Sequence, residues 1–409
     1  MAAEIALVTV SGKDQPGLMS MLTSLLARYQ AQVLDIGQAV IHEELALGLL
    51  VHLPGVGEAG KLRGALDALA AQTGALVESR AVSADDYCEW AAGSGQPRRV
   101  ITLLMRGDAT AVLSAVSSLT HRNGLNIDTV RRLSGRLPLG EPAAPKRLCA
   151  EMRVRGALAE PAALQADLMA AAAELAFDFS LHEDTVFRRN RRLVAFDMDS
   201  TLIGVEVMDE LARRHGVGRE VSAITRRAMA GEMDFKASFR ARAALLAGMP
   251  AATLHEVADT AVLNPGAGRL LKALRHFGYR TAILSGGFQY VGERLKARLG
   301  IDYVFANELE VKDGLVTGQV RGEIIDAERK AALLRRIAQQ EGIRLAQTIA
   351  VGDGANDLPM LSAAGLGVAY HAKPVVRRTA SHAISNFGLD SVLYLMGFSD
   401  RDIDQALGW

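Results

Sequence analysis

The chain has 409 residues, of which 49% are hydrophobic and 22% charged, with 46 basic and 46 acidic side chains. This balance provides no bulk charge to favour nucleic acid or an anionic membrane as a partner, and the length predicts two to four domains. Two cysteines, Cys88 and Cys149, exclude a disulfide framework and have no metal-ligand spacing. No basic region precedes the first apolar run, and no apolar run approaches about 18 residues, so we expect a cytoplasmic protein.

Residues 1–92 are predicted to form one βαββαβ unit. Apolar and β-branched runs indicate strands at 5–10, twice within 31–53, and at 75–82, with helices at 18–25 and 57–72. The stretch "AAGSGQPRR" at 91–99 is rich in Gly, Ser and Pro, which is typical of a linker.

Residues 98–183 repeat the same pattern. "GLNIDTVRRL" is similar to "AQVLDIGQAV", and Asp128 follows Asp35 by 93 residues. Strands are expected in "VITLLMRGD", "GLNIDTVRRL", "KRLCAEMRVRG" and "AFDFSLHED", with helices at 111–122 and up to 175. We interpret the two segments as a duplicated ferredoxin-like βαββαβ unit.

Residues 190–409 change to an alternation of strands and helices, which indicates an α/β fold with a doubly wound parallel sheet. Strands are expected in "LVAFDMD", "RTAILSG", "YVFANEL", "QTIAVGD" and "LGVAY". About four helical patterns and no strand fill 206–262, which we interpret as a helical cap. "VKDGLVTG" at 311–318 predicts a hairpin with an Asp-Gly turn, and the last 17 residues predict one or two closing helices.

Polar residues follow three of these strands at the point where each ends. They are Asp197 and Asp199, Ser285-Gly286-Gly287, and Asp353 with Asn356 and Asp357. Side chains at i and i+2 of an extended strand share a face, so two carboxylates there repel unless a cation or a proton compensates. Ligands of open α/β sheets bind at the carboxyl ends of strands, so we expect one shared site. Oxygen ligands without His or Cys favour Mg²⁺, between Asp197 and Asp353.

The motifs "DMDST", "SGG", Lys330 and "GDGAND" occur in the order found in the haloacid dehalogenase-like phosphatases, over roughly 190–395. "DMDSTLIGVEVMDELA", "AMAGEMDFKASFRARAALLAG" and "SGGF" resemble the phosphoserine phosphatase family of that superfamily in particular. Any one motif would be weak support, since a serine before Gly-Gly is usually a turn and a helix lysine is usually solvated. The four motifs together, in this order, are specific to the superfamily.

The resemblance implies a role for each matching residue. Asp197 would attack phosphorus and form an aspartyl phosphate, and Asp199 would act as general acid and then general base. The carboxylates of Asp197 and Asp353 and the backbone carbonyl of Asp199 would hold Mg²⁺. Ser285, the Gly286 amide and Lys330 would bind phosphoryl oxygens, Asn356 would orient the phosphoryl group or water, and Asp357 would support the metal or Lys330. The residues alone leave open which aspartate takes which role.

Two cap residues are candidates for recognising an amino acid. Glu206 begins a helix and could meet an ammonium group, although an acidic residue there also complements the helix dipole. Arg242 interrupts the apolar face formed by Phe235, Phe239 and Leu246; it suits bidentate capture of a carboxylate, although it could simply extend its charge to solvent. Met229 and Phe235 resemble the family's apolar lid residues, and a plain core role is as good an explanation for each.

The paired N-terminal units resemble ACT domains, which bind amino acids and regulate metabolic enzymes. Asp14 and Gly17 lie between the first strand and helix, where such domains take ligand, and Pro16 in a first helical turn would leave amides free for a carboxylate. Asp14 could equally be a helix cap. The corresponding residues of the second unit are Gly107 and Asp108, in "RGDATA", which lacks the Pro-Gly pair. Sheets of this type commonly pair between subunits, so we expect a homodimer.

The resulting hypothesis is a Mg²⁺-dependent phosphatase that hydrolyses O-phospho-L-serine in the last step of serine biosynthesis, with L-serine as a candidate effector and no nucleic-acid or membrane partner. Alternatives are a relative acting on phosphothreonine, phosphohomoserine or phosphoprotein, and phosphoryl transfer to a second alcohol. An amino-acid-sensing protein with a vestigial phosphatase half is disfavoured by the intact site residues. The absence of membrane spans argues against an ion-pumping ATPase.

Overall fold

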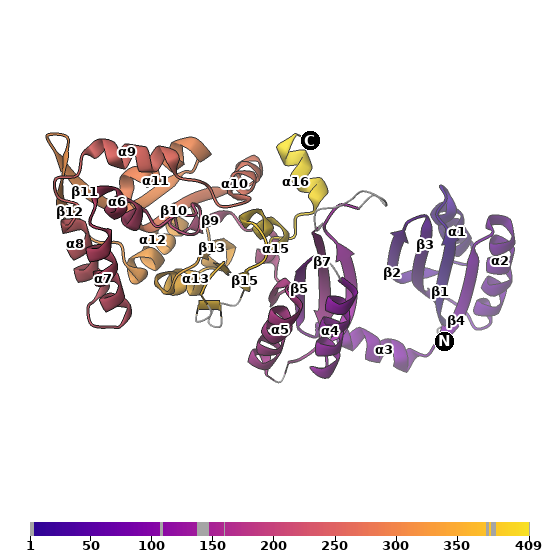
Figure 1. The fold of residues 1–409 in the computed structure, drawn as a ribbon. Helices are drawn as coiled ribbons and strands as arrows, with labels where there is room; N and C mark the ends of the chain where they lie inside the picture. Colours follow the sequence, from indigo (N-terminus) through magenta and orange to yellow (C-terminus); the bar gives the residue numbers. More distant parts are fainter. Residues whose placement is uncertain are drawn as a thin grey trace. The chain divides into compact units, whose positions relative to one another are not determined.

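The computed structural model describes residues 4–106, 109–136, 147–158, 160–373, 376–377 and 382–408. The chain divides into two compact units, residues 1–96 and 97–409, which are described separately (Figure 1). Among the helices of these described residues, none is long and apolar enough to cross a membrane.

The first unit is a four-stranded antiparallel sheet with the strand order β2-β3-β1-β4. Its elements are β1 (Glu4–Lys13), α1 (Leu18–Arg28), β2 (Gln32–Ile41), β3 (Glu44–Leu53), α2 (Glu58–Thr73), β4 (Leu76–Val82) and α3 (Ala84–Ala92). Leucines of α1 and α2 pack on alternate residues of the strands to form one core. The βαββαβ prediction is therefore confirmed, but α3 was missed: Ser83 caps it by accepting from the Asp86 amide, so part of the expected linker is helical.

The second unit begins with the same fold, in the matching strand order β6-β7-β5-β8. Its elements are β5 (Arg98–Met105), α4 (Ala109–Arg122), β6 (Asn126–Arg132), β7 (Leu148–Arg155), α5 (Pro161–Leu175) and β8 (Asp178–Glu183). The register of β2 shifts between Val33 and Asp35, and that of β6 between Ile127 and Thr129. A bulge in nearly the same place of each copy supports the duplication.

The remaining strands form the doubly wound sheet, in the order β12-β11-β10-β9-β13-β14-β15. They are β9 (Leu193–Phe196), β10 (Arg280–Phe288), β11 (Tyr303–Lys312), β12 (Leu315–Arg321), β13 (Thr348–Gly352), β14 (Leu366–Tyr370) and β15 (His382–Ile384). All pairs are parallel except β11 with β12, which forms the expected hairpin around Asp313 and Gly314, both at positive φ. The short strand β15 was missed.

Helices cover both faces of this sheet, as a doubly wound fold requires. Alternate side chains of β9 separate into two cores: Val194 and Phe196 belong to one, Leu193 and Ala195 to the other. The main helices are α10 (Ala267–His276) and α11 (Gln289–Leu299) in the first core, and α12 (Ala327–Gln340) and α13 (Leu358–Ala363) in the second. The closing helices are α15 (Val392–Leu395) and α16 (Asp400–Leu407).

The cap consists of four helices, in agreement with the sequence pattern. They are α6 (Val207–His215), α7 (Gly218–Met229), α8 (Phe235–Ala244) and α9 (Ala251–Thr260). A Lys236–Asp326 ion pair of 3.0 Å links α8 to the N-terminus of α12, so the cap is tied to the core beside the expected site.

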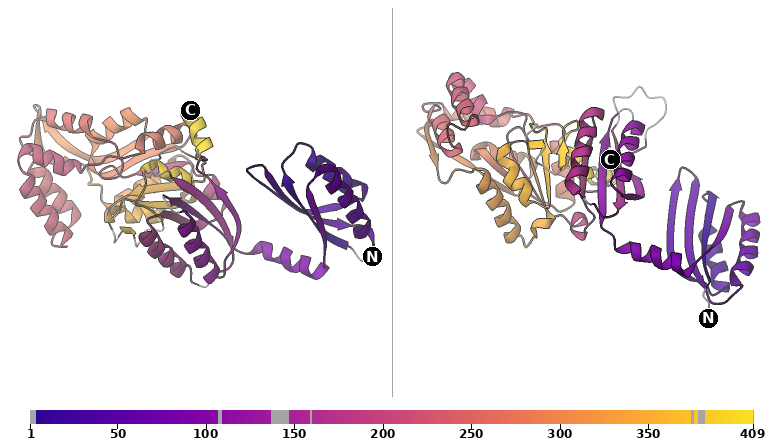
Figure 2. Two further views of the ribbon diagram at one scale, coloured as in Figure 1. Left: turned by 45° about the vertical axis from the view of Figure 1, so that its right-hand side comes forward. Right: turned by 90° about the horizontal axis from the view of Figure 1, so that it is seen from below.

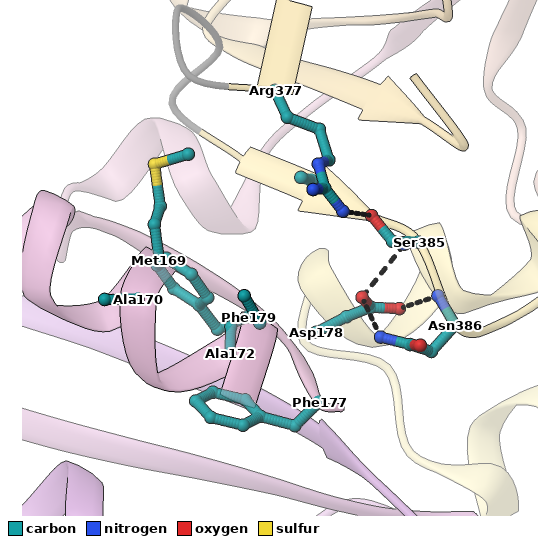
Figure 3. A pocket seen from close by; sticks show the side chains of 11 residues that line it. Met169, Ala170, Ala172, Phe177, Asp178, Phe179, Arg377, Ser385 and Asn386 are labelled. Carbon is teal, nitrogen blue, oxygen red and sulfur yellow. Dashed lines mark hydrogen bonds between the residues drawn. The ribbon is translucent and has the colours of Figure 1, made fainter. Parts of the chain in front are cut away.

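The second βαββαβ copy and the doubly wound sheet share one continuous sheet, because β15 pairs antiparallel with β8 (Figures 1 and 2). The buried carboxylate of Asp178 holds this junction: it accepts from the amides of Ser385 and Asn386 at 2.9 and 2.8 Å, and from the Asn386 side chain at 3.0 Å (Figure 3). The division expected at 184–190 is thus a connection between two folds within one hydrogen-bonded sheet.

Candidate active site

Lys330 lies between two buried carboxylates at the carboxyl edge of the sheet. Its Nζ donates to Oδ1 of Asp197, at the end of β9, and to Oδ1 of Asp357, after β13, each at 2.7 Å. Burial lowers the pKa of Lys330, but the two carboxylates outweigh burial and raise it overall, so the ammonium stays charged. Lys330 is fully buried, and the interpretation of a solvated helix lysine is therefore wrong.

The carboxylates of this edge are more numerous than one lysine can neutralise. Oxygens of Asp197, Asp353 and Asp357 lie within 4.8 Å of one another. Burial and the charge of Asp357 raise the pKa of Asp197 to about 7 against the opposing effect of Lys330. Burial and Asp357 likewise raise the pKa of Asp353 to about 6. Three close carboxylates, of which Asp197 and Asp353 have raised pKa values, fit the binding of a hard divalent cation, which would relieve their repulsion.

Two of these carboxylates differ in how many of their oxygens already accept a hydrogen bond. Asp357 accepts from Lys330 through Oδ1 and from the Gly354 amide through Oδ2 at 2.9 Å, so both of its oxygens are engaged. Asp353 accepts from the Thr201 hydroxyl at 3.0 Å through one oxygen. Asn356 lies in the same turn, half-buried. Asp353 is therefore the better metal ligand, and Asp357 the better support for Lys330.

Asp199 has the environment of an acid. Its side chain is buried, Oδ2 accepts from the Val207 amide at 3.3 Å, and Oδ1 has no partner among the described residues. Burial, then the charges of Glu206 and Asp197, raise its pKa well above the ordinary value. A carboxyl group held protonated near neutral pH can donate a proton to a leaving group.

Two glycines near the C-terminal end of β10, Gly286 and Gly287, leave room for no side chain of their own beside Asp199. A Cβ placed on Gly287 would lie 3.0 Å from Asp199 Oδ2 and 3.2 Å from Ser285 Oγ, which accepts from the Gly287 amide at 2.9 Å. A Cβ on Gly286 would lie 3.2 Å from the ring of Phe235 in the cap. The "SGG" motif thus brings the serine, the acid and the cap around one volume.

The cap residues occupy the other side of this volume. Glu206 is the exposed N-cap residue of α6; its side chain makes no cap hydrogen bond and instead accepts from the Ser200 hydroxyl at 2.7 Å. Arg242 is half-buried, and among the described residues no carboxylate lies within ion-pairing distance of it. Burial lowers the pKa of Arg242, whereas Asp209 and Glu206 raise it, which places both acids near the guanidinium.

The two lid candidates differ. Phe235 is stacked on Phe239, with ring centroids 6.2 Å apart, and reaches Gly286. Met229 is 70% exposed, so the core role considered for it is wrong.

A haloacid dehalogenase-like hydrolase model matches residues 194–362, and an ACT domain model matches residues 4–79. A phosphoserine phosphatase of Streptomyces coelicolor is 40% identical over 98% of this chain and 94% of its own length. Phosphoserine phosphatase SerB2 of Mycobacterium tuberculosis is 39% identical over 99% and 96%. This chain belongs to the phosphoserine phosphatase family.

Solved structures of the family's fold agree with this membership. A HAD family hydrolase from Salmonella enterica serovar Typhi matches with a TM-score of 0.62 and 34% identity, over 73% of this chain and 98% of its own. A probable phosphoserine phosphatase from Vibrio cholerae matches with a TM-score of 0.59 and 34% identity, over 76% and 88%. The enzyme class and the two fold types expected from the motifs are therefore confirmed.

Two asparagines that support the phosphatase-family site were missed from the sequence. Asn264 donates to the carbonyls of Ser200 and Thr201 at 3.0 and 2.8 Å, which holds the turn after Asp199. Asn307, buried in the middle of β11, donates to the Gly286 carbonyl and accepts from the Ile325 amide, each at 2.8 Å. Asn307 is a polar residue inside the expected strand "YVFANEL", a signal that could have found it; Asn264 lies outside the strands and carries no such signal.

The candidate regulatory residues are only partly described. Helix α1 begins at Leu18, and Gly17 precedes it at φ 94°, where a side chain would be strained. The N-cap residue of the helix is Gly17, and no side chain caps the helix. Asp14 is exposed, and the alternative role of a helix cap is therefore wrong for it. Pro16 lies before the helix rather than in its first turn. Gly107 and Asp108 lie outside the described residues.

Proposed function

We propose that this protein is a Mg²⁺-dependent phosphatase that hydrolyses O-phospho-L-serine to L-serine and phosphate through an aspartyl-phosphate intermediate. The observation that carries the proposal is the buried Asp197–Lys330–Asp357 arrangement, with 2.7 Å at each contact. It is accompanied in the cap by Arg242, for which the described residues provide no carboxylate partner within ion-pairing distance. Membership of the phosphoserine phosphatase family gives the substrate class independent support.

The carboxylates divide the chemistry between them. An oxygen of Asp197 attacks phosphorus, the bond from phosphorus to the serine oxygen breaks, and Asp199 gives that oxygen its proton. Asp199 then takes a proton from the water that attacks the phosphoryl group and releases Asp197. Asp199 suits both steps because its free Oδ1 and raised pKa let it exchange a proton near neutral pH.

The chain's own groups can neutralise the charge that develops during transfer. Lys330, the Ser285 hydroxyl and the Gly286 amide would bind phosphoryl oxygens, with Asn356 orienting the phosphoryl group or water. The carboxylates of Asp197 and Asp353 and the backbone carbonyl of Asp199 would hold Mg²⁺, which when bound supplies further charge neutralisation. Asp357 would keep Lys330 in position, because both its oxygens are already engaged.

The serine part of the substrate would lie under the cap. Arg242 would donate to the carboxylate, since no acidic side chain within the described residues pairs with it, and Glu206 would accept from the ammonium. Phe235 would close the volume beside Gly286.

Phosphate release from O-phospho-L-serine, with and without Mg²⁺, tests the proposal in wild type and Asp197→Asn. We expect Mg²⁺-dependent turnover and a loss of at least about 10³-fold in the variant, since the amide cannot act as nucleophile. Ser11→Ala, on β1 of the first unit, serves as a control and should match wild type. No turnover by the wild type would contradict the substrate assignment; unchanged turnover by Asp197→Asn would contradict the nucleophile.

The wider biological setting belongs to the same proposal. Amino-acid binding at the ACT units, with L-serine as effector and Asp14 and Gly17 near the ligand, would regulate a cytoplasmic homodimer in the last step of serine biosynthesis. The match of an ACT domain model to residues 4–79 supports the amino-acid class of effector.

A further inference from the structure

A charged cavity lies at the edge of the doubly wound sheet opposite the candidate active site, where β9 and β10 begin. Its volume is about 550 Å³, and its charged lining consists of four arginines and one carboxylate: Arg189, Arg191, Arg192, Arg280 and Glu341. Arg191 precedes β9 and Asp197 follows it, and six residues at an extended rise separate the two by about 20 Å. The cavity is therefore distinct from the site of Asp197 and Lys330.

Arg191 is the unusual member of this lining. Its side chain is only 5% exposed, yet Nε and Nη1 have no hydrogen-bond partner among the described residues. Burial, then the nearby charge of Arg188, lower its pKa to about 10, so the group is still a cation at neutral pH. Burying a cation without a partner costs free energy, and a bound anion would offset that cost.

The neighbouring acidic groups are already engaged elsewhere. Glu341 and Asp302 accept from Arg280 at 3.0 Å each, and the nearest oxygen of Asp184 lies 3.8 Å from Arg189. Buried Glu151 pairs with Arg188, whose Nε donates to His182 at 2.6 Å. Each of these acids faces another arginine.

The surroundings of Arg191 add positive rather than negative charge. Its guanidinium contributes to the lowered pKa of both His182 and His382, which places it close to the two imidazoles. An anion at this point would compensate a cluster that the chain itself leaves positive.

The segment that carries Arg191 is held in place by backbone contacts. The Arg192 amide donates to the Gln347 carbonyl, the Arg192 carbonyl accepts from the Arg280 amide, and the Gln347 side chain donates to the Asn190 carbonyl, each at 2.8 Å. The backbone on either side of Arg191 is therefore anchored before any ligand arrives, which reduces the ordering cost of binding.

The other wall of the cavity is aromatic. Phe277 and Phe398 stack at 4.3 Å between ring centroids, and the ring of Tyr279 meets Phe398 edge-on. Burial raises the pKa of Tyr279 to about 12, so its hydroxyl remains a donor. A cavity of this kind offers cations to one end of a ligand and apolar rings to the other.

We propose that this cavity binds a small phosphate-bearing anion, whose oxygens accept from the buried guanidinium of Arg191 and whose remaining part lies against Phe277 and Phe398. The site is independent of the proposed phosphatase reaction. Free inorganic phosphates and organic phosphates share the recognising chemistry, and the two sources are separated by the aromatic wall, which only an organic phosphate would use.

The test is calorimetric titration of the full-length protein, in EDTA, with pyrophosphate and with adenosine monophosphate. We expect one site, at least about tenfold weakened by Arg191→Met because charged hydrogen bonds are lost. Ser285→Ala removes a phosphoryl ligand of the active site, and Arg335→Met removes an exposed arginine of α12; both should bind as wild type does. Tighter binding of the nucleotide than of pyrophosphate would identify an organic phosphate, and the reverse order a free inorganic one.

Three results would overturn the proposal: no binding of either probe to wild type, equal binding by Arg191→Met, or a loss confined to Ser285→Ala. If Arg191→Met does not fold, Arg191→Lys takes its place, since it keeps the charge but loses the planar donors. Weakened binding by the lysine variant supports the site, and unchanged binding overturns it.

Discussion

At the residue scale, the site depends on how a few charges are compensated. Lys330 satisfies one oxygen each of Asp197 and Asp357, yet the pKa of Asp197 is still raised to about 7. One ammonium is therefore insufficient for the carboxylates gathered there, which is the physical reason for placing a divalent cation beside Asp353. Asp199 lacks such compensation, and its protonated form follows from burial.

Arg242→Lys tests substrate recognition at the same scale. Loss of the planar guanidinium should raise KM for O-phospho-L-serine by about 10- to 100-fold, because a lysine cannot make a bidentate contact with the carboxylate. KM for p-nitrophenyl phosphate, which has no carboxylate, should change little. Steady-state kinetics on both substrates provide the measurement.

Arg240→Lys is the matched control, since Arg240 is an exposed arginine of the same helix α8. If Arg242→Lys changed KM equally for the two substrates, the assigned role of Arg242 would be contradicted. The same holds if Arg240→Lys raised KM for O-phospho-L-serine as much as Arg242→Lys does.

At the element scale, the β15–β8 pairing is the main feature that the sequence pattern did not reveal. Only His382 and Ala383 of the three-residue strand β15 pair with β8, yet the pairing joins two folds into one sheet. The rings of His182 in β8 and His382 in β15 pack edge to face, with their centroids 5.7 Å apart. Burial, then the charge of Arg191, lower the pKa of His382 to about 3.

This lowered pKa predicts a pH-dependent stability. In the unfolded chain His382 gains a proton near pH 6.5, whereas in the folded chain it stays neutral until about pH 3. The unfolded state binds more protons in that window, so the free energy of unfolding falls by up to about 1.4 kcal/mol per pH unit on acidification. His382→Gln should reduce this slope between pH 6 and 4, measured by urea denaturation.

His255→Gln, at an exposed histidine of α9, provides the comparison. Identical slopes in wild type and His382→Gln would show that the buried imidazole does not contribute.

At the scale of the whole molecule, the two units differ in what they contain. All the predicted catalytic residues lie within residues 97–409, and residues 1–96 form their own core. The second βαββαβ copy, although a repeat of the first, is joined to the catalytic sheet through β8 and Asp178. Similar sequence patterns thus serve as a separate unit in one case and as part of the phosphatase unit in the other.

Two truncations test this difference. A chain of residues 97–409 should keep turnover of O-phospho-L-serine and lose any inhibition by L-serine that depends on the first unit. A chain beginning at residue 190 lacks β8, exposes the edge of β15 and removes the partners of Ser385 and Asn386; we expect a lower melting temperature. Phosphate release and thermal unfolding are the measurements. Equal melting temperatures of the two truncated chains would contradict the structural role of β8.

Much of the fold and of the catalytic set follows from the sequence because its signals are local. Apolar periodicity places strands and helices, and a parallel sheet brings residues at strand ends such as Asp197, Ser285 and Asp353 to one edge. Helix α3 was not predicted because its short amphipathic pattern lies beside a Gly-rich linker. Strand β15 was not predicted because a strand of three residues is too short to show a periodic pattern.

The sequence by itself determined the duplicated βαββαβ units, the doubly wound sheet with its cap, and the order of the motifs. Only the tertiary structure decided that Lys330 bridges Asp197 and Asp357, that Asn264 and Asn307 hold the site, and that Met229 is exposed. It also decided that Arg191 is buried without a partner. Burial and pairing of a charge depend on residues distant in the chain, and no local pattern around a residue contains that information.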